Sequence, residues 1–182
     1  MLGIDTYNIA GASLFSNSQP PHPATCSQCG RKTDQDFVNP IYRVRKRRRD
    51  ATATYDGYFL VSERFKAQCE REQWPGVEFV RLPADPAFFW LRGTRTLEFD
   101  AERRETRFKR YCTACGGYCD VIGSTPIYLK GISAPLGEGF YRTDLEFASG
   151  PEQHPLIIVG PRTGQQIKSQ KYPVLDVSPI EI

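Results

Sequence analysis

Two short cysteine motifs carry the clearest chemistry in this chain. Both read C-x-x-C-G, the first at residues 26–30 and the second at residues 112–116. Two thiolates with this spacing on a tight turn bind one tetrahedral cation from the same side. The glycine that follows lets the backbone fold back, so that amides point at the sulfurs. Together the motifs predict one closed structural zinc site. The predicted ligands are Cys26, Cys29, Cys112 and Cys115.

The two motifs lie far apart, with 82 residues between Cys29 and Cys112. This separation is much longer than the ligand spacing of a compact zinc ribbon. A shared metal would therefore join the start of the chain to its middle. We expect its loss to destabilise the fold, because the binding energy of such a site becomes folding energy.

Other uses of the six cysteines are weighed against this prediction. A single C-x-x-C motif also occurs in redox pairs, and two disulfides would account for the same four residues. Cys119, four residues after Cys115, and His22 are alternative metal ligands. Cys69 lies in a helical stretch and is expected to be a small buried residue.

The composition favours a reducing compartment. No run of 18 apolar residues is present, and residues 1–12 lack the basic and apolar regions of a signal peptide. We therefore expect a cytoplasmic protein with no membrane span. Cysteines in that compartment stay reduced, which favours a metal over disulfides.

The elements that must position the cysteines indicate an α+β fold. Ser62 is a good N-cap for a helix, and a strand at 77–82 follows it. A hairpin of 96–100 and 105–111 is expected to lead into the second motif, and a helix is expected from Thr163 to Gln170. We predict mainly antiparallel sheet, two or three helices and a zinc-ribbon-like pair of CxxCG knuckles.

The predicted organisation is a single α+β domain over residues 1–182. Its zinc-ribbon module is formed by about 24–32 and 105–123. The apolar fraction of 40%, with 11 Phe and 9 Tyr, is enough for a substantial core. The residues expected there are Phe65, Cys69, Phe79, Phe88, Trp90, Leu156, Ile158 and Val159.

Motifs for catalysis are missing from the sequence. It contains no G-x-S-x-G, H-E-x-x-H or P-loop pattern, and its histidines are His22 and His154. A zinc ion held by four cysteines has no open position for water. We therefore expect a binding protein and no enzyme.

A basic run over residues 43–49 suggests a second class of function. The run reads Arg-Val-Arg-Lys-Arg-Arg-Arg within a chain of formal net charge +3. Such a run is suited to phosphate contacts, so a nucleic-acid-binding zinc ribbon is the alternative prediction. A solvated edge strand or loop, where charge prevents edge-to-edge pairing, is the simpler explanation of the run. No aromatic residue interrupts it to stack on bases.

Further segments resemble a known family. Between the motifs stand Tyr-Phe-Leu-Val-Ser-Glu-Arg-Phe at 58–65 and Gly-Val-Glu-Phe at 76–79. The tail carries Tyr-Arg-Thr-Asp-Leu-Glu-Phe at 141–147 and an apolar run at 155–160. With the paired knuckles, this order resembles the double-CXXCG motif immunity proteins of bacterial polymorphic-toxin systems. The resemblance extends from about residue 26 to residue 180.

The resemblance implies a cytoplasmic protein that binds and neutralises a cognate toxin. Nucleases are common among such toxins, although the net charge of +3 argues against a wholly acidic mimic of nucleic acid. Acidic residues in the last third are candidates for contact with a basic toxin face, and solvated surface charge is the simpler explanation of each. These residues are Asp144, Glu146 and Glu152. We expect the contact surface on loops and strand edges away from the knuckles.

Overall fold

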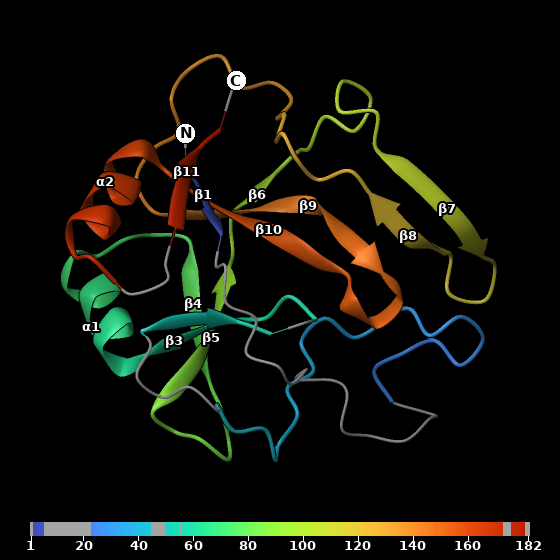
Figure 1. Cartoon of the computed structure of the whole chain (residues 1–182), viewed down its shortest axis with the longest axis horizontal. Coiled ribbons are helices and arrows are strands. Elements are labelled where there is room, and N and C mark those ends of the chain that lie inside the picture. The colour runs from blue at the N-terminus through green and yellow to red at the C-terminus, as the bar shows by residue number, and fades with distance from the viewer. Residues whose placement is uncertain (1, 6–22, 45–49, 55, 173–175, 181–182) are drawn as a thin grey trace.

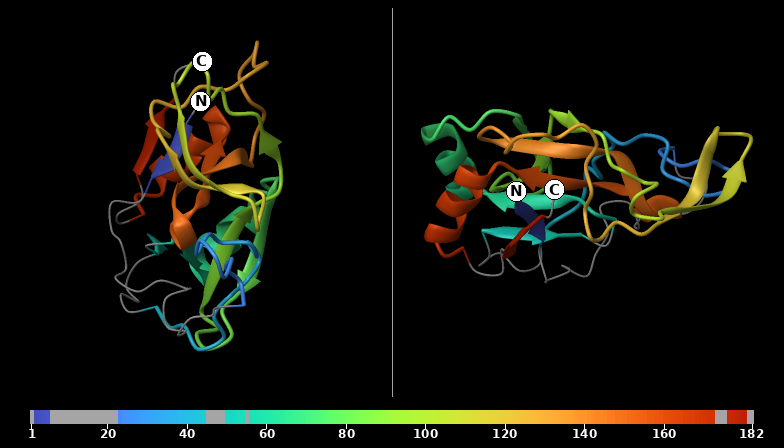
Figure 2. Two further views of the ribbon diagram at one scale, coloured as in Figure 1. Left: turned by 90° about the vertical axis from the view of Figure 1, so that its right-hand side faces the viewer. Right: turned by 90° about the horizontal axis from the view of Figure 1, so that it is seen from above.

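The computed structural model describes residues 2–5, 23–44, 50–54, 56–172 and 176–180. In these ranges the chain forms eleven β-strands, two α-helices and one 3-10 helix, arranged around two sheets (Figure 1). The molecule is elongated. Both α-helices lie at one end and the β7–β8 hairpin projects at the other (Figure 2).

The larger sheet contains seven strands. All its neighbouring strands are antiparallel except β6, which runs parallel to β9. Its path is β11 (Asp176–Pro179), β1 (Leu2–Asp5), β10 (His154–Val159), β9 (Phe140–Ser149), β8 (Gly117–Ile122) and β7 (Arg107–Cys112), with β6 (Thr96–Leu97) beside β9. The segment after the second cysteine motif is therefore built into the main sheet.

The smaller sheet contains four antiparallel strands. Its order is β2 (Ala51–Ala53), β3 (Phe59–Ser62), β5 (Phe88–Gly93) and β4 (Val77–Arg81). Helix α1 (Glu63–Arg71) follows β3 directly. The Ser62 hydroxyl accepts a hydrogen bond from the Phe65 amide at 3.3 Å, which confirms the predicted N-cap.

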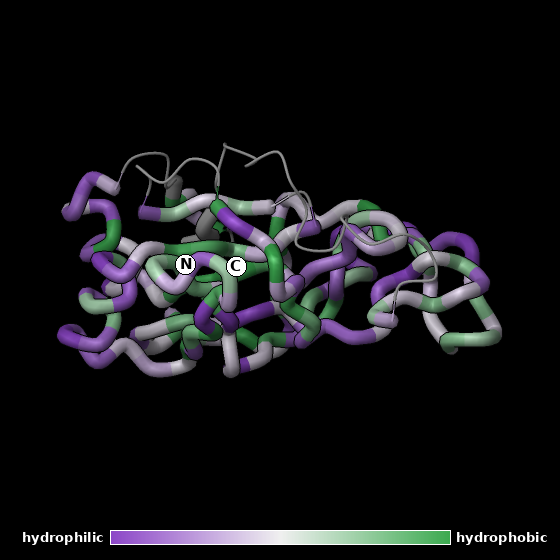
Figure 3. The backbone as a smooth tube through the Cα atoms, turned by 90° about the horizontal axis from the view of Figure 1, so that it is seen from below, coloured by the Kyte–Doolittle hydropathy of each residue, from purple (hydrophilic) through white to green (hydrophobic). Residues whose placement is uncertain are grey.

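The main core lies between the two sheets and the two helices. Figure 3 shows hydrophobic backbone stretches running through the middle of the molecule, with hydrophilic turns at its helical end. The core residues come from both sheets and both helices, and α2 (Pro161–Ser169) packs against β11. They include Phe59, Val61, Phe65, Cys69, Phe89, Leu91, Phe140, Val159 and Ile167.

Most of the predicted core residues are enclosed. Five are buried: Phe65, Cys69, Phe88, Ile158 and Val159. The other three, Phe79, Trp90 and Leu156, are half-buried and pack against the margins of apolar clusters. Phe79 is only half-buried because β4 is an edge strand with no further strand beside it in the described sheet.

The predicted hairpin of 96–100 and 105–111 is wrong. Residues 96–97 form β6 and pair with β9, whereas β7 pairs with β8 across the second cysteine motif. The predicted turn (residues 101–104) and the observed turn (residues 113–116) both have four residues, so loop length does not decide between the two pairings. Residues 96–97 pair with β9 instead, a contact between segments that are distant in sequence. The second cysteine motif itself is therefore the hairpin turn.

The expected start of the second helix is also wrong. Helix α2 begins at Pro161, with Gly160 as an N-cap that offers no side-chain hydrogen bond. A proline at the first helical position loses no hydrogen bond, because that amide has no partner within the helix. The Thr163 hydroxyl instead accepts a hydrogen bond from the Gly139 amide at 2.8 Å, which ties the helix to the loop before β9.

The predicted fold class is confirmed. The chain is α+β with two α-helices, mostly antiparallel sheet and four cysteines gathered from two knuckles. Its division into a single domain with a zinc-ribbon module stays a prediction. Neither α-helix among the described residues has the length or apolar character needed to cross a membrane.

Candidate metal centre

The first knuckle is a tight turn closed by two backbone hydrogen bonds. The Gly30 amide donates to the Cys26 carbonyl at 2.8 Å, and the Cys26 amide donates to the Arg31 carbonyl at 2.8 Å. Gly30 has a φ of 73°, in the left-handed region that glycine adopts without strain. A Cβ built there meets no atom within 4 Å, so the glycine is needed for its backbone conformation alone.

The second knuckle repeats this geometry at the tip of the β7–β8 hairpin. The Gly116 amide donates to the Cys112 carbonyl at 2.9 Å, and Gly116 has a φ of 67°. Cys112 is the last residue of β7 and pairs with Gly117, the first residue of β8. The sheet therefore sets the direction in which this pair of thiols points.

The two knuckles face each other and bring four thiols together. The Sγ atoms of Cys26 and Cys112 are 3.9 Å apart, and those of Cys29 and Cys115 are 3.7 Å apart. All four Sγ atoms lie within 4.8 Å of one another. In Figure 1 the blue loop that contains the first knuckle lies beside the turn between β7 and β8.

This geometry fits a tetrahedral metal. A Zn–S bond of about 2.3 Å places neighbouring sulfurs of a regular tetrahedron roughly 3.8 Å apart. The distances across the two knuckles agree with that value. Cys26, Cys29, Cys112 and Cys115 would hold the ion, and its chemical contribution would be a crosslink between the two knuckles.

Backbone amides favour the thiolate form of one cysteine in each knuckle. The amide of Cys29, followed by that of Gln28, lowers the pKa of Cys26. The amide of Cys115 is the largest cause that lowers the pKa of Cys112, to about 7. Burial raises the pKa of Cys29. The turns thus direct N–H groups at the sulfurs, as expected of a thiolate site.

The first knuckle is held against the main sheet by Arg31. Its Nε donates to Gln153 Oε1 at 2.9 Å, and Gln153 Nε2 donates to the Tyr118 carbonyl at 2.9 Å. A Cβ built at Gly117 would meet the Arg31 guanidinium at 2.6 Å, so the arginine lies directly over the hairpin. Sequence reasoning missed the buried Gln153, because nothing in its local pattern marks it.

Lys32 links the same segment to the smaller sheet. This lysine is only 2% exposed, and its Nζ donates to the Asp56 carbonyl at 3.1 Å. The ammonium also lies 4.5 Å from the centre of the Tyr58 ring, an attractive cation–π distance. Burial lowers the pKa of Lys32 to about 8.

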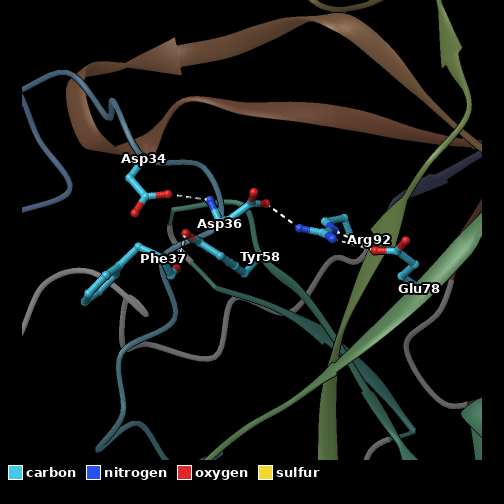
Figure 4. A network of polar contacts seen from close by, with 6 residues as sticks. All are labelled: Asp34, Asp36, Phe37, Tyr58, Glu78 and Arg92. Atoms are coloured by element: carbon cyan, nitrogen blue, oxygen red, sulfur yellow. Dashed lines mark hydrogen bonds and ion pairs between the residues drawn. The ribbon is translucent and has the colours of Figure 1, made fainter.

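The chain beyond Lys32 continues across the smaller sheet. Arg92 on β5 is paired with Asp36 and with Glu78 on β4, and Glu78 is the largest cause that raises the pKa of Arg92 (Figure 4). The Tyr58 hydroxyl donates to the Phe37 carbonyl at 2.7 Å. The first knuckle is therefore connected to both sheets, and the metal would connect it to the hairpin as well.

The other residues considered from the sequence, among them the alternative metal ligands Cys119 and His22, lie outside the four-thiol group or outside the described residues. Cys119 is buried on β8 and lies outside the four-thiol group, although it also contributes to the raised pKa of Cys29. Cys69 is enclosed in the main core, as expected. His22 lies outside the described residues. Of the basic run 43–49, residues 45–49 also lie outside them.

Two of the three acidic candidates for partner binding, Asp144 and Glu146, lie on β9, and the third, Glu152, lies in the connection between β9 and β10. Asp144 Oδ1 accepts from the amides of Phe99 and Leu145, and Glu146 Oε2 accepts from Gln35 Nε2 at 2.6 Å. Glu146 is half-buried and lies 3.8 Å from Arg31. Glu152 is exposed in the 3-10 helix η1 (Gly150–Glu152). The role of the three residues in binding stays a prediction.

Comparison with known proteins found no match to this chain. The chain matches no family model, and neither a curated protein nor a solved structure was found to be similar to it.

Proposed function

We propose that this chain is an immunity protein that binds and neutralises a cognate bacterial toxin, with one structural zinc ion stabilising its fold. The observation that carries the proposal is the closed thiolate centre. Its four thiols come from two distant segments and lie within 4.8 Å of one another, so all four sulfurs would be used on one metal. A centre of this kind makes a rigid protein and leaves no position for a substrate on the metal.

Zinc is the metal that suits these ligands. Thiolates are soft, and a tetrahedral set of four is typical of structural zinc sites. Magnesium and calcium take oxygen ligands instead. The amides that lower the pKa of Cys26 and Cys112 support binding at neutral pH, because each ligand must lose its proton first.

Rigidity is useful to an inhibitor that acts by binding. A surface that is already ordered loses little conformational entropy when a partner docks, which favours a tight complex. The family resemblance supplies the class of partner, a toxin delivered by neighbouring cells. Thiolates stay reduced in the cytoplasm and can therefore bind zinc there. We expect this protein to meet the toxin in that compartment.

Co-expression tests this function directly. The toxin encoded beside this gene would be expressed in a sensitive host with the intact chain, with Cys112→Ser, or with an empty vector. We expect the intact chain to restore growth and the variant to protect less, because the fold depends on the metal. Killing of cells that contain normal amounts of soluble intact chain would overturn the proposal.

Metal analysis tests the cofactor separately. Purified protein should contain about one zinc per chain for a four-thiolate site. If preparations from the reducing cytoplasm contain no metal and both cysteine pairs are oxidised, the zinc assignment is wrong. Steep salt-dependent binding to nucleic acid would instead favour the alternative function of the basic run 43–49.

A further inference from the structure

Three aromatic rings are exposed on the projecting hairpin. Phe108 and Tyr111 on β7 are 39% and 57% exposed, and Tyr118 on β8 is 41% exposed. The ring centres of Phe108 and Tyr118 are 5.3 Å apart, and those of Tyr111 and Tyr118 are 5.1 Å apart. The three side chains, called here the aromatic cluster, form one continuous apolar surface.

The backbone of β7 places these rings together. Residues three apart in a regular strand point to opposite faces of the sheet. Arg110 has a φ of 54°, a left-handed conformation that interrupts the alternation between Phe108 and Tyr111. Both rings consequently contact Tyr118. A non-glycine residue rarely adopts this conformation without a structural or functional reason.

The cluster is not part of the core of the hairpin. Cys119 and Val121 on β8 are buried, and Val121 packs with Phe99 and Phe147. The hairpin therefore has its own apolar support beneath the sheet. The aromatic cluster adds a second apolar surface that no described residue covers, at the outermost strand of the seven-stranded sheet.

Positive charge lies on the same strand as two of the rings. Arg107 and Lys109 flank Phe108 in the sequence, are exposed, and make no ion pair with a described residue. Lys109 lies opposite Asp120, however, and helps Arg110, the largest cause, to lower the pKa of that carboxyl. Arg110 is already paired with Asp120, with two contacts of 2.6 Å. The cations of β7 that are available to contact a partner are therefore Arg107 and Lys109.

We propose that the aromatic cluster, with Arg107 and Lys109, is the surface that docks the partner, and that the partner is a protein with acidic groups around an apolar contact. The inference rests on the proposed function, so the partner is the cognate toxin. Exposed tyrosines beside arginine are typical of the residues that dominate protein interfaces. The cations select an acidic face.

Two observations favour a protein over single-stranded nucleic acid. The rings meet at interplanar angles of 53° and 65°, so they pack into one compact group instead of displaying separate platforms for successive bases. Only two cations without an ion pair lie on the strand, which is few for a groove that follows a phosphate backbone.

This surface differs from the one expected from the sequence. The acidic candidates Asp144 and Glu146 accept hydrogen bonds from within the chain, whereas the hairpin presents cations and rings outward. The metal centre contributes by holding the turn of the same hairpin, so that the cluster docks without first being ordered.

The experiment measures binding of the full chain to the purified product of the adjacent toxin gene. Tyr111→Ser tests the rings, and the double variant Arg107→Glu with Lys109→Glu tests the charge. The matched control is Lys168→Glu with Lys171→Glu, an equal charge change on exposed residues at the helical end. We expect each hairpin variant to raise Kd at least about tenfold and the control to leave it unchanged.

The outcomes separate the two proposals. If the wild-type chain binds and the hairpin variants bind equally well, this surface is wrong while the proposed function stands. If the wild-type chain does not bind the toxin, the proposed function fails and this inference fails with it. Binding of a labelled single-stranded oligonucleotide that is lost in the hairpin variants would replace the protein partner with a nucleic acid. Zinc content and thermal unfolding verify that each variant is folded.

Discussion

The two ends of the molecule are stabilised in different ways. At the helical end, side chains such as Phe65, Phe140 and Ile167 are fully enclosed between two sheets and two helices. At the hairpin end, five of the six residues of β7 are exposed, so this strand buries little apolar surface. Four thiols that could bind a metal are gathered there instead. A region too thin to bury much apolar surface needs a crosslink to hold its shape.

The difference shows how rigidity and exposure coexist. A strand held by apolar burial must hide its rings, whereas a strand that a metal would hold at its turn is free to display them. The hairpin displays Phe108, Tyr111 and Tyr118. Figure 2 shows this hairpin extending well beyond the body of the molecule.

Removal of one metal ligand should have the largest effect. In Cys112→Ser the centre loses a thiolate and the crosslink between the knuckles, and we expect the free energy of unfolding to fall by more than about 5 kcal/mol. Hydrogen exchange should show the hairpin and residues 24–32 losing protection before α1 and α2. Thr113→Ser, an exposed change in the same turn, is the control. Equal stability of Cys112→Ser and the control would contradict the crosslink.

The same substitution at the two ends should give very different costs. Phe65→Ala leaves a cavity in the main core and should cost about 3–5 kcal/mol, measured by denaturant unfolding. Phe108→Ala removes an exposed ring and should cost about 1 kcal/mol or less. Both variants should keep their zinc. Similar costs at the two positions would mean that the ends are not stabilised differently.

The hydrogen bonds of Gln153 offer a smaller test. Gln153→Ala removes the link between Arg31 and the Tyr118 carbonyl, both partly buried, and should cost about 1–3 kcal/mol. We also expect faster loss of zinc to a chelator, because the first knuckle is less firmly docked. Gln165→Ala, exposed on α2, is the control. Unchanged release of zinc would show that the knuckle is held by the metal alone.

Lys32 should produce the smallest effect, seen as a pH dependence. Burial lowers its pKa from 10.5 to about 8. Between these values the unfolded chain binds more protons than the folded chain, so the free energy of unfolding rises with pH. Below pH 8 both states carry the charge and its burial cost is complete.

The variant Lys32→Met isolates this contribution from other groups that titrate at alkaline pH. The free energy of unfolding of the wild-type chain, minus that of the variant, should rise by about 1 kcal/mol from pH 7 to pH 9. Urea unfolding at each pH measures the difference. A difference that stays constant over this range would mean that the folded protein leaves the lysine pKa near its ordinary value.

Local sequence was sufficient for the features that depend on neighbouring residues. The C-x-x-C-G motifs predicted both knuckles, because ligand spacing and a left-handed glycine are local properties. Ser62 predicted the start of α1, because an N-cap acts within one turn. The strand at 77–82 was found for the same reason, since the stop at Trp74–Gly76 bounds it.

Only the tertiary structure decided which distant segments pair and which surfaces remain open. Strand β6 joins β9 and not β7, and the Thr163 hydroxyl bonds a loop amide instead of capping its helix. The exposure of Tyr111 and Tyr118 depends on β7 being the outermost strand of the sheet. Sheet order and burial arise from contacts between residues far apart in sequence, and no local pattern encodes them.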